Sequence, residues 1–187
     1  MNSPFTILGI PGSLRKASFN HKALIAAQQL LPEGAVLEIA DISGIPLFNQ
    51  DLESNVPEAV TTLKQQIRAA DAVLFATPEY NYSVPGVLKN VIDWASRPPG
   101  DSAWEGKPAA ILSASPGPFG GARAQYHLRQ TLGALNMPTL NRPDVMIAQA
   151  QQKFDASGNL TDEVAKKLIR QLLAGLVAWA TRLNSSV

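Results

Sequence analysis

Small polar residues and one arginine gather in a short segment, residues 12–20 (GSLRKASFN), which leads directly into a stretch with helical spacing. A phosphate at such a position would meet free backbone N–H groups and the positive end of the helix dipole. Ser13, Ser18 and Asn20 add neutral donors. Arg15 adds a charge-assisted contact. The segment predicts a phosphate site, and the alternative is an ordinary helix start capped by Ser18 or Asn20.

Two common nucleotide-binding motifs are missing from this part of the chain. GxxxxGK[ST] is absent, which disfavours nucleoside triphosphate hydrolysis. Residues 9–12 (GIPG) have the wrong spacing for GxGxxG and place a proline in the middle, which counts against a dinucleotide pyrophosphate cradle. A monophosphate is therefore the ligand that the segment suits.

A second segment, residues 77–86 (TPEYNYSVPG), combines aromatic and polar side chains with two prolines. Pro78 and Pro85 restrict the backbone near both ends. Such a stiff segment suits a planar aromatic ligand, with Tyr80 covering the ring and Asn81 bonding to its edge. The alternative is a surface loop whose tyrosines pack on a neighbouring helix or subunit.

Five short apolar runs are the elements that must position these segments. Each carries apolar side chains on both faces, as strands do when helices cover both sides of a parallel sheet. The runs are Phe5–Ile10, Ala35–Ala40, Ala72–Ala76, Ala109–Ala114 and Val145–Ala148. Stretches with helical spacing follow the runs, which predicts βαβ units.

The pattern predicts an α/β fold of the flavodoxin-like type, a three-layer sandwich with a five-stranded parallel sheet in the order 2-1-3-4-5. A six-stranded Rossmann sheet would need more chain. We expect residues 1–187 to form a single domain. In such a sheet the ligand lies beyond the carboxyl ends of the strands, near the switch point between strands 1 and 3. The segments after the first, third and fourth runs should therefore line one site.

Two expectations concern residues away from these segments. Thr161 is expected to cap the last helix, because acidic residues and an apolar stripe follow it. The stripe comprises Val164, Leu168, Leu172, Leu176, Ala180 and Leu183. Trp104 lies close after the segment 98–101 (PPGD), and we expect it to be exposed near the ligand or a partner.

Composition excludes several classes of function. The 187 residues are 45% hydrophobic and 17% charged, which argues against disorder. A net charge of +1 gives no field for a nucleic-acid backbone. The absence of Cys excludes disulfides, thiolate metal sites and cysteine nucleophiles, and with two His we expect no metal site. Without a signal peptide or an apolar run of roughly 20 residues, we expect a cytoplasmic protein that does not enter membranes.

Three motifs in order carry a family resemblance: GSLRKASFN, then TPEYNYSVPGVLKNVIDWASRP, then GGARAQYHLRQ at residues 120–130. Together they resemble the NADPH-dependent FMN reductase family of the flavodoxin-like superfamily, and within it the bacterial quinone and chromate reductases. The resemblance extends from about Phe5 to Arg142. It implies non-covalent FMN, with NADPH or NADH as the co-substrate.

The resemblance also implies a role for each loop. The phosphate of FMN would bind at Ser13, Arg15, Ser18, Phe19 and Asn20. The isoalloxazine would lie, largely through backbone contacts, against Pro78, Glu79, Tyr80 and Asn81. The third loop would contact the other side of the flavin through Ser115 and Gly117. No catalytic side chain is expected, since the flavin carries the redox chemistry and hydride transfer to it needs no general base such as Glu79.

The implied activity is a two-step exchange at one site. A nicotinamide passes hydride to the flavin and leaves, and a small-molecule acceptor takes its place: a quinone, a flavin, an azo compound or a metal oxyanion such as chromate. The alternatives are a flavodoxin-like electron carrier, which the net charge of +1 disfavours, and a flavin-free scaffold, which would not need the phosphate residues.

The family commonly forms homodimers and homotetramers. Arg123, Tyr126 and Arg129 recur at offsets of three, so they share a helix face. They could bind a nicotinamide nucleotide phosphate or a neighbouring subunit, and we favour the subunit. His127, on the same helix, is expected to be an interface or half-buried residue and not a proton donor.

Overall fold

The computed structural model describes residues 3–185, which form strands and helices in alternation. The strands are β1 (Phe5–Pro11), β2 (Ala35–Ile39), β3 (Ala72–Thr77), β4 (Ala109–Ala114) and β5 (Val145–Ile147). The α-helices are α1 (Phe19–Gln28), α2 (Glu58–Ala69), α3 (Gly86–Ala95), α4 (Ala122–Ala134) and α5 (Glu163–Asn184). Two 3₁₀ helices, η1 (Gln50–Asn55) and η2 (Ala150–Gln152), lie in the connections before α2 and α5.

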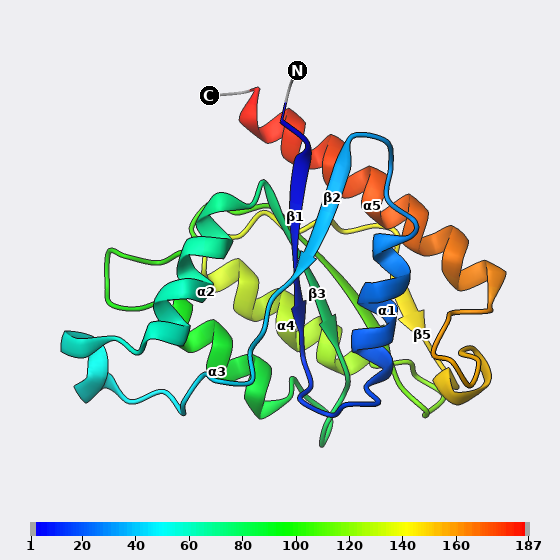
Figure 1. Cartoon of the computed structure of the whole chain (residues 1–187), viewed down its shortest axis with the longest axis horizontal. Coiled ribbons are helices and arrows are strands. Elements are labelled where there is room, and N and C mark those ends of the chain that lie inside the picture. Colours follow the sequence, from blue (N-terminus) through cyan, green and yellow to red (C-terminus); the bar gives the residue numbers. More distant parts are fainter. Residues whose placement is uncertain (1–2, 186–187) are drawn as a thin grey trace.

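All five strands are parallel, in the order β2-β1-β3-β4-β5. This confirms the flavodoxin-like arrangement expected from the sequence. Helices α1 and α5 cover one face of the sheet and α2, α3 and α4 cover the other (Figure 1). The carboxyl ends of β1 and β3 lie side by side, because Pro11 pairs with Ala76.

Two apolar cores separate the sheet from its helices, one on each face. Successive residues of β1 alternate between them, with Ile7 in the core beneath α1 and α5, and Leu8 and Ile10 in the core beneath α2, α3 and α4. Every residue of β3 and β4 is buried. Since full burial of each such aliphatic side chain contributes about 1.5–3 kcal/mol, the two-sided apolar runs fix the strands between the helix layers.

Helix α5 differs from the expectation at its first turn. Asp162 is the cap, because its carboxylate accepts a hydrogen bond from the backbone N–H of Ala165 at 2.8 Å. The Thr161 hydroxyl instead donates to the Lys153 carbonyl at 3.1 Å. Val164 is 66% exposed. The buried face consists of Ala165, Ile169, Leu172, Leu173, Leu176 and Ala180. The stripe predicted from the sequence is therefore wrong by one position at Val164 and Leu168 and correct from Leu172 to Ala180.

The expected exposure of Trp104 is also wrong. Its side chain is fully buried in the core beneath α2, α3 and α4, and its ring centroid lies 5.6 Å from that of Phe75. The indole N–H donates to the carbonyl of Ile92 at 3.0 Å. That hydrogen bond lets a tryptophan from an irregular segment enter a core without leaving its polar atom unpaired.

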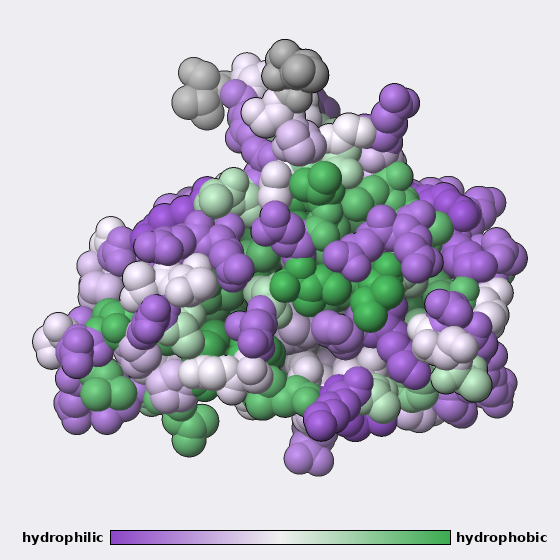
Figure 2. All heavy atoms as spheres, in the orientation of Figure 1, coloured by the Kyte–Doolittle hydropathy of each residue, from purple (hydrophilic) through white to green (hydrophobic). Residues whose placement is uncertain are grey.

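Hydrophilic side chains cover much of the face shown in Figure 2, but hydrophobic ones gather over β2 and the adjoining helices. β2 is an edge strand, and Val36 on it is partly exposed, as is Ile25 on α1. No helix within residues 3–185 has the length and apolar character needed to cross a membrane.

Candidate functional site

The loops that follow β1, β3 and β4 meet at the carboxyl edge of the sheet, as predicted. The backbone N–H of Gly12 donates to the Ala76 carbonyl at 2.7 Å, and a Cβ on Gly12 would lie 3.0 Å from the Cα of Thr77. Glycine therefore lets the first loop lie directly against the second. Between the loops is an open cleft of about 350 Å³, lined by Ser13, Arg15, Ser18, Phe19, Asn20, Pro78, Tyr80, Ala114 and Pro116.

The start of α1 forms one end of this cleft and carries unpaired donors. Ser18 is the cap, because its hydroxyl accepts from the His21 backbone N–H at 3.3 Å. The N–H groups of Phe19 and Asn20, in the first turn, have no intrahelical acceptor. The first turn holds no acidic residue. This donor set, together with the exposed guanidinium of Arg15, fits the phosphate of FMN.

The side chain of Asn20 has a structural task. Its amide N–H donates to the Ala114 carbonyl at 2.8 Å, and its amide oxygen accepts from the Ala114 N–H at 2.8 Å. Both residues are buried. The pair of hydrogen bonds ties the start of α1 to the end of β4. Any contact of Asn20 with a phosphate would therefore come from its backbone N–H, and the cap is Ser18 alone.

A tight turn, residues 80–83, forms the rim of the second loop. Tyr80 and Ser83 exchange two backbone hydrogen bonds of 3.1 Å. Asn81 and Tyr82 have φ values of 49° and 72°, the left-handed conformation of both central residues in a type I′ turn. The Tyr80 hydroxyl lies 3.4 Å from the Ser13 hydroxyl, which joins the first two loops beside the cleft.

Glu79 is paired and so is not placed as a free general base. Its Oε1 lies 2.6 Å from a guanidinium nitrogen of Arg123, and its Oε2 accepts from the Arg123 backbone N–H at 3.0 Å. The guanidinium carbon lies 4.4 Å from the ring centroid of Tyr82 and 4.3 Å from that of Phe119. Arg123 thereby links the loop after β3 to the loop after β4.

The polar set expected on α4 separates in the structure. Arg129 donates to the Leu140 carbonyl at 3.0 Å, away from the cleft. Tyr126 is exposed. His127 shares a hydrogen bond of 2.9 Å with the Ser83 hydroxyl, so it supports the turn at residues 80–83. Arg123 and His127 on α4 therefore bond to the loop after β3, through Glu79 and Ser83.

The third loop depends on two glycines whose importance the sequence pattern did not reveal. Gly120 and Gly121 have φ values of 59° and 89°. A Cβ on Gly120 would lie 2.8 Å from the Met146 carbonyl carbon, and one on Gly121 would lie 2.8 Å from the Cβ of Ser113. The signal in the sequence was the glycine pair directly before a helix. Two residues without side chains allow α4, and Arg123 on it, to lie close to the sheet.

Ser115 and Gly117 lie in this third loop but not in the lining of the cleft. The Gly117 N–H donates to the Ser115 hydroxyl at 3.2 Å, and the Ser115 N–H donates to the Ile147 carbonyl at 3.0 Å. Glu79 and Asn81 are likewise in the expected loop but outside the lining. The other predicted binding residues all line the cleft.

Comparison with known proteins agrees with this geometry. The family model for NADPH-dependent FMN reductases matches residues 5–152. The chain is 58% identical to an NAD(P)H-dependent FMN reductase of Pseudomonas aeruginosa, over 98% of this chain and all of that one. It is 43% identical to a quinone reductase of Pseudomonas putida, over the full length of both. A solved flavoenzyme NAD(P)H:(acceptor) oxidoreductase of Paracoccus denitrificans superposes with a TM-score of 0.87, at 39% identity over 95% of this chain and 97% of that one.

The 2-1-3-4-5 sheet, the donors at the start of α1 and the ring-lined cleft between the loops define a flavin-binding α/β protein of the flavodoxin-like class. The chain belongs to the NADPH-dependent FMN reductase family, and it is an FMN-dependent NAD(P)H oxidoreductase.

Proposed function

We propose that the protein uses quinones as its principal acceptors and also reduces flavins, azo compounds and metal oxyanions such as chromate. The cleft is the observation that carries this proposal. It is open, and among residues 3–185 Arg15 is the only charged side chain in its lining. In a site of that kind, the size and shape of an acceptor decide whether it reaches the flavin. No particular side chain is needed to recognise it. Relatives named as quinone reductases support quinones as the principal class.

Bound FMN would accept a hydride from the nicotinamide and pass the electrons on to the acceptor. The residues of the chain bind and orient it. The first-turn N–H groups of Phe19 and Asn20, the hydroxyls of Ser13 and Ser18 and the guanidinium of Arg15 would hold the phosphate.

Pro78 and the backbone of residues 79–81 would form one wall for the isoalloxazine, with Tyr80 at its edge. The loop of Ser115 and Gly117 would form the opposite wall. Because Glu79 is neutralised by Arg123, the wall after β3 adds little net charge beside the flavin. Donor and acceptor would use the same open face in turn, which gives ping-pong kinetics.

We further propose that residues 1–187 act as a single FMN-binding domain in a cytoplasmic homodimer or homotetramer. Aromatic rings on the rim of the cleft and on α4 support self-association, because Tyr82, Phe119 and Tyr126 are each more than half exposed. Sedimentation at several protein concentrations tests this assembly, and a monomer at all of them would contradict it.

The direct test is an anaerobic titration of the FMN-reconstituted protein with NADPH and then NADH, followed by the visible absorbance of the flavin. We expect rapid bleaching that a benzoquinone reverses. Parallel lines in double-reciprocal plots against quinone concentration would support the exchange at one site. Flavin that bleaches but is not reoxidised by any quinone would overturn the acceptor class proposed here.

A further inference from the structure

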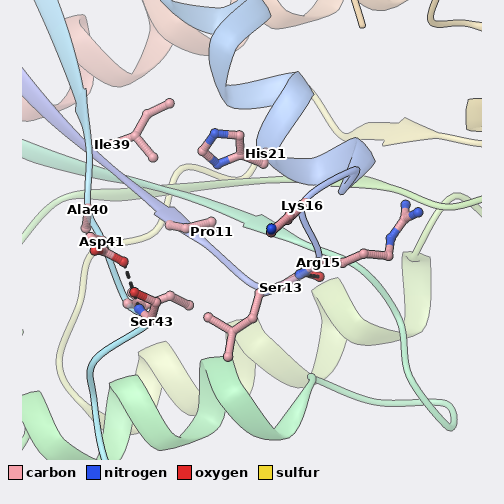
Figure 3. A pocket seen from close by; sticks show the side chains of 11 residues that line it. Pro11, Ser13, Arg15, Lys16, His21, Ile39, Ala40, Asp41 and Ser43 are labelled. Atoms are coloured by element: carbon pink, nitrogen blue, oxygen red, sulfur yellow. Dashed lines mark hydrogen bonds between the residues drawn. The ribbon is translucent and has the colours of Figure 1, made fainter. Parts of the chain in front are cut away.

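A second cleft, of about 310 Å³, lies at the same edge of the sheet between the loop after β1 and the segment that follows β2 (Figure 3). Ser13 and Arg15 line both this cleft and the flavin cleft. A single loop therefore separates the two clefts. The roles assigned to FMN do not account for the second one, since none of the expected isoalloxazine contacts lines it.

One wall of the second cleft presents a carboxylate. Asp41 follows β2, and its Oδ1 accepts a hydrogen bond from the backbone N–H of Ser43 at 2.8 Å. Hydrogen bonds from the Ser43 backbone and side chain lower the pKa of Asp41, so the carboxylate is ionised at neutral pH. An oriented, ionised carboxylate is an acceptor for hydroxyl groups.

The facing wall is basic and the floor between them is apolar. Lys16 and His21 enter the cleft from the loop after β1 and from α1, and Pro11 and Ile39 lie between them and Asp41 (Figure 3). The lining thus combines a cationic group, an apolar surface and a hydroxyl acceptor. A nucleotide carries the complementary groups, namely a diphosphate, a planar base and a ribose diol.

The position of the carboxylate points the same way. In parallel α/β sheets with β2 beside β1, an acidic residue beyond the carboxyl end of β2 can bind the hydroxyls of an adenosine ribose. Asp41 occupies that position, because β2 ends at Ile39, which pairs with Gly9, and Asp41 follows two residues later. The chain lacks GxGxxG, so the diphosphate would be held by side chains.

We propose that the second cleft binds the adenosine diphosphate part of NAD(P)H, with Asp41 accepting hydrogen bonds from the ribose hydroxyls and Lys16 contacting the diphosphate. This assignment rests on the NAD(P)H oxidoreductase function. The nicotinamide must reach the flavin cleft, and the nucleotide then crosses the loop at Ser13 and Arg15 into the neighbouring cleft. The apolar floor formed by Pro11 and Ile39 receives the base.

The test compares two hydride donors on FMN-loaded protein: NADH, and reduced nicotinamide mononucleotide, which lacks the adenosine part. Asp41→Asn keeps an oxygen for the Ser43 N–H, so the segment should fold as before. We expect kcat/KM for NADH to fall about tenfold in Asp41→Asn and in Lys16→Gln, with kcat/KM for the mononucleotide unchanged. Glu38→Gln, an exposed carboxylate of β2 outside the cleft, is the matched control and should leave both values unchanged.

Binding without turnover gives a second measurement. Calorimetric titration of ADP-ribose into FMN-loaded protein should give the same affinity for the wild type and Glu38→Gln, and at least tenfold weaker binding for Asp41→Asn. The proposal is overturned if the variants lose activity equally with both donors, if they lose none with NADH, or if ADP-ribose binds Asp41→Asn as tightly as the wild type. Wild-type protein that oxidised neither donor would contradict the oxidoreductase function itself, and the titration would still test the cleft.

Discussion

The loop after β1 and the loop after β3 line the same cleft but are held by different means. The first is anchored at its two ends by hydrogen bonds, from the Gly12 N–H to the Ala76 carbonyl and between the Asn20 amide and the Ala114 backbone. The residues between these ends are largely exposed. The second is held along its length, through the Glu79 ion pair, the turn at residues 80–83 and the Ser83–His127 hydrogen bond. A phosphate site requires donors that the protein leaves unpaired, whereas a wall for a ring requires a fixed shape.

Removing an anchor of the first loop should have the largest effect. Asn20→Ala leaves the buried N–H and carbonyl of Ala114 without partners, at a cost of about 1–3 kcal/mol for each unsatisfied group. We expect the free energy of unfolding to fall by about 3 kcal/mol in urea titrations of the apoprotein. FMN affinity should also fall, because the first turn of α1 is no longer fixed to β4.

Asn90→Ala is a matched control for this prediction. The Asn90 amide also makes two hydrogen bonds to the backbone, to Pro46 and from Phe48, but it lies on α3 away from the cleft. We expect a smaller loss of stability and no change in FMN affinity. Equal losses of FMN affinity in the two variants would show that the Asn20 anchor has no special relation to the phosphate site.

Removing a donor of the first loop should affect the ligand and not the fold. Among residues 3–185 the Arg15 guanidinium has no ion-pair partner, and its central carbon lies 5.4 Å from the centroid of the Phe19 ring. Arg15→Gln should therefore weaken FMN binding about thirtyfold, the loss of a charged hydrogen bond worth about 2 kcal/mol, and leave apoprotein stability within about 0.5 kcal/mol. Riboflavin, which has no phosphate, should bind both proteins alike in fluorescence titrations. A parallel loss of riboflavin affinity would place Arg15 away from the phosphate.

The same contrast explains what could be predicted from the sequence. The sheet order and the residues of the first loop were predictable, because two-sided apolar runs and a cluster of donors before a helix are local signals. The Asn20 bridge, the Glu79–Arg123 pair and the second cleft join residues far apart in the chain. No local pattern specifies such partners, so they emerge only once the strands are placed side by side.

The errors have related causes. Trp104 lies in an irregular segment, where local composition suggests exposure, yet the hydrogen bond to the Ile92 carbonyl permits its burial. Thr161 and Asp162 are adjacent, and both residue types suit a helix cap. The Thr161 hydroxyl bonds to the Lys153 carbonyl instead, which leaves Asp162 as the cap. In each case a tertiary hydrogen bond decided between local alternatives.

For the second loop, the ion pair that links it to α4 is the next test. A double-mutant cycle of Glu79→Gln and Arg123→Gln should give a coupling free energy of about 1 kcal/mol, because the Glu79 side chain is only 11% exposed. The equivalent cycle on Lys89 and Asp93, an exposed pair on α3, should give about 0.3–0.5 kcal/mol. A coupling free energy no greater at Glu79 than at Lys89 would mean that the loop after β3 does not depend on its ion pair for its shape.

A small net effect on stability is also expected at Tyr82, where two contributions oppose each other. A non-glycine residue at a φ of 72° costs about 1–2 kcal/mol, so Tyr82→Gly relieves strain but adds chain entropy to the unfolded state and loses the contact with Arg123. We expect the free energy of unfolding of Tyr82→Gly to lie within about 0.5 kcal/mol of the wild-type value. Tyr82→Ala keeps the strain and loses the ring, so it should be about 1 kcal/mol less stable than Tyr82→Gly. If the alanine and glycine variants were equally stable, the turn would not be strained at this position. No contribution of the ring would then be needed to explain why a tyrosine stands there. If instead they differ as expected, a side chain is retained in a conformation that favours glycine, which implies that the ring of Tyr82 serves the rim of the cleft.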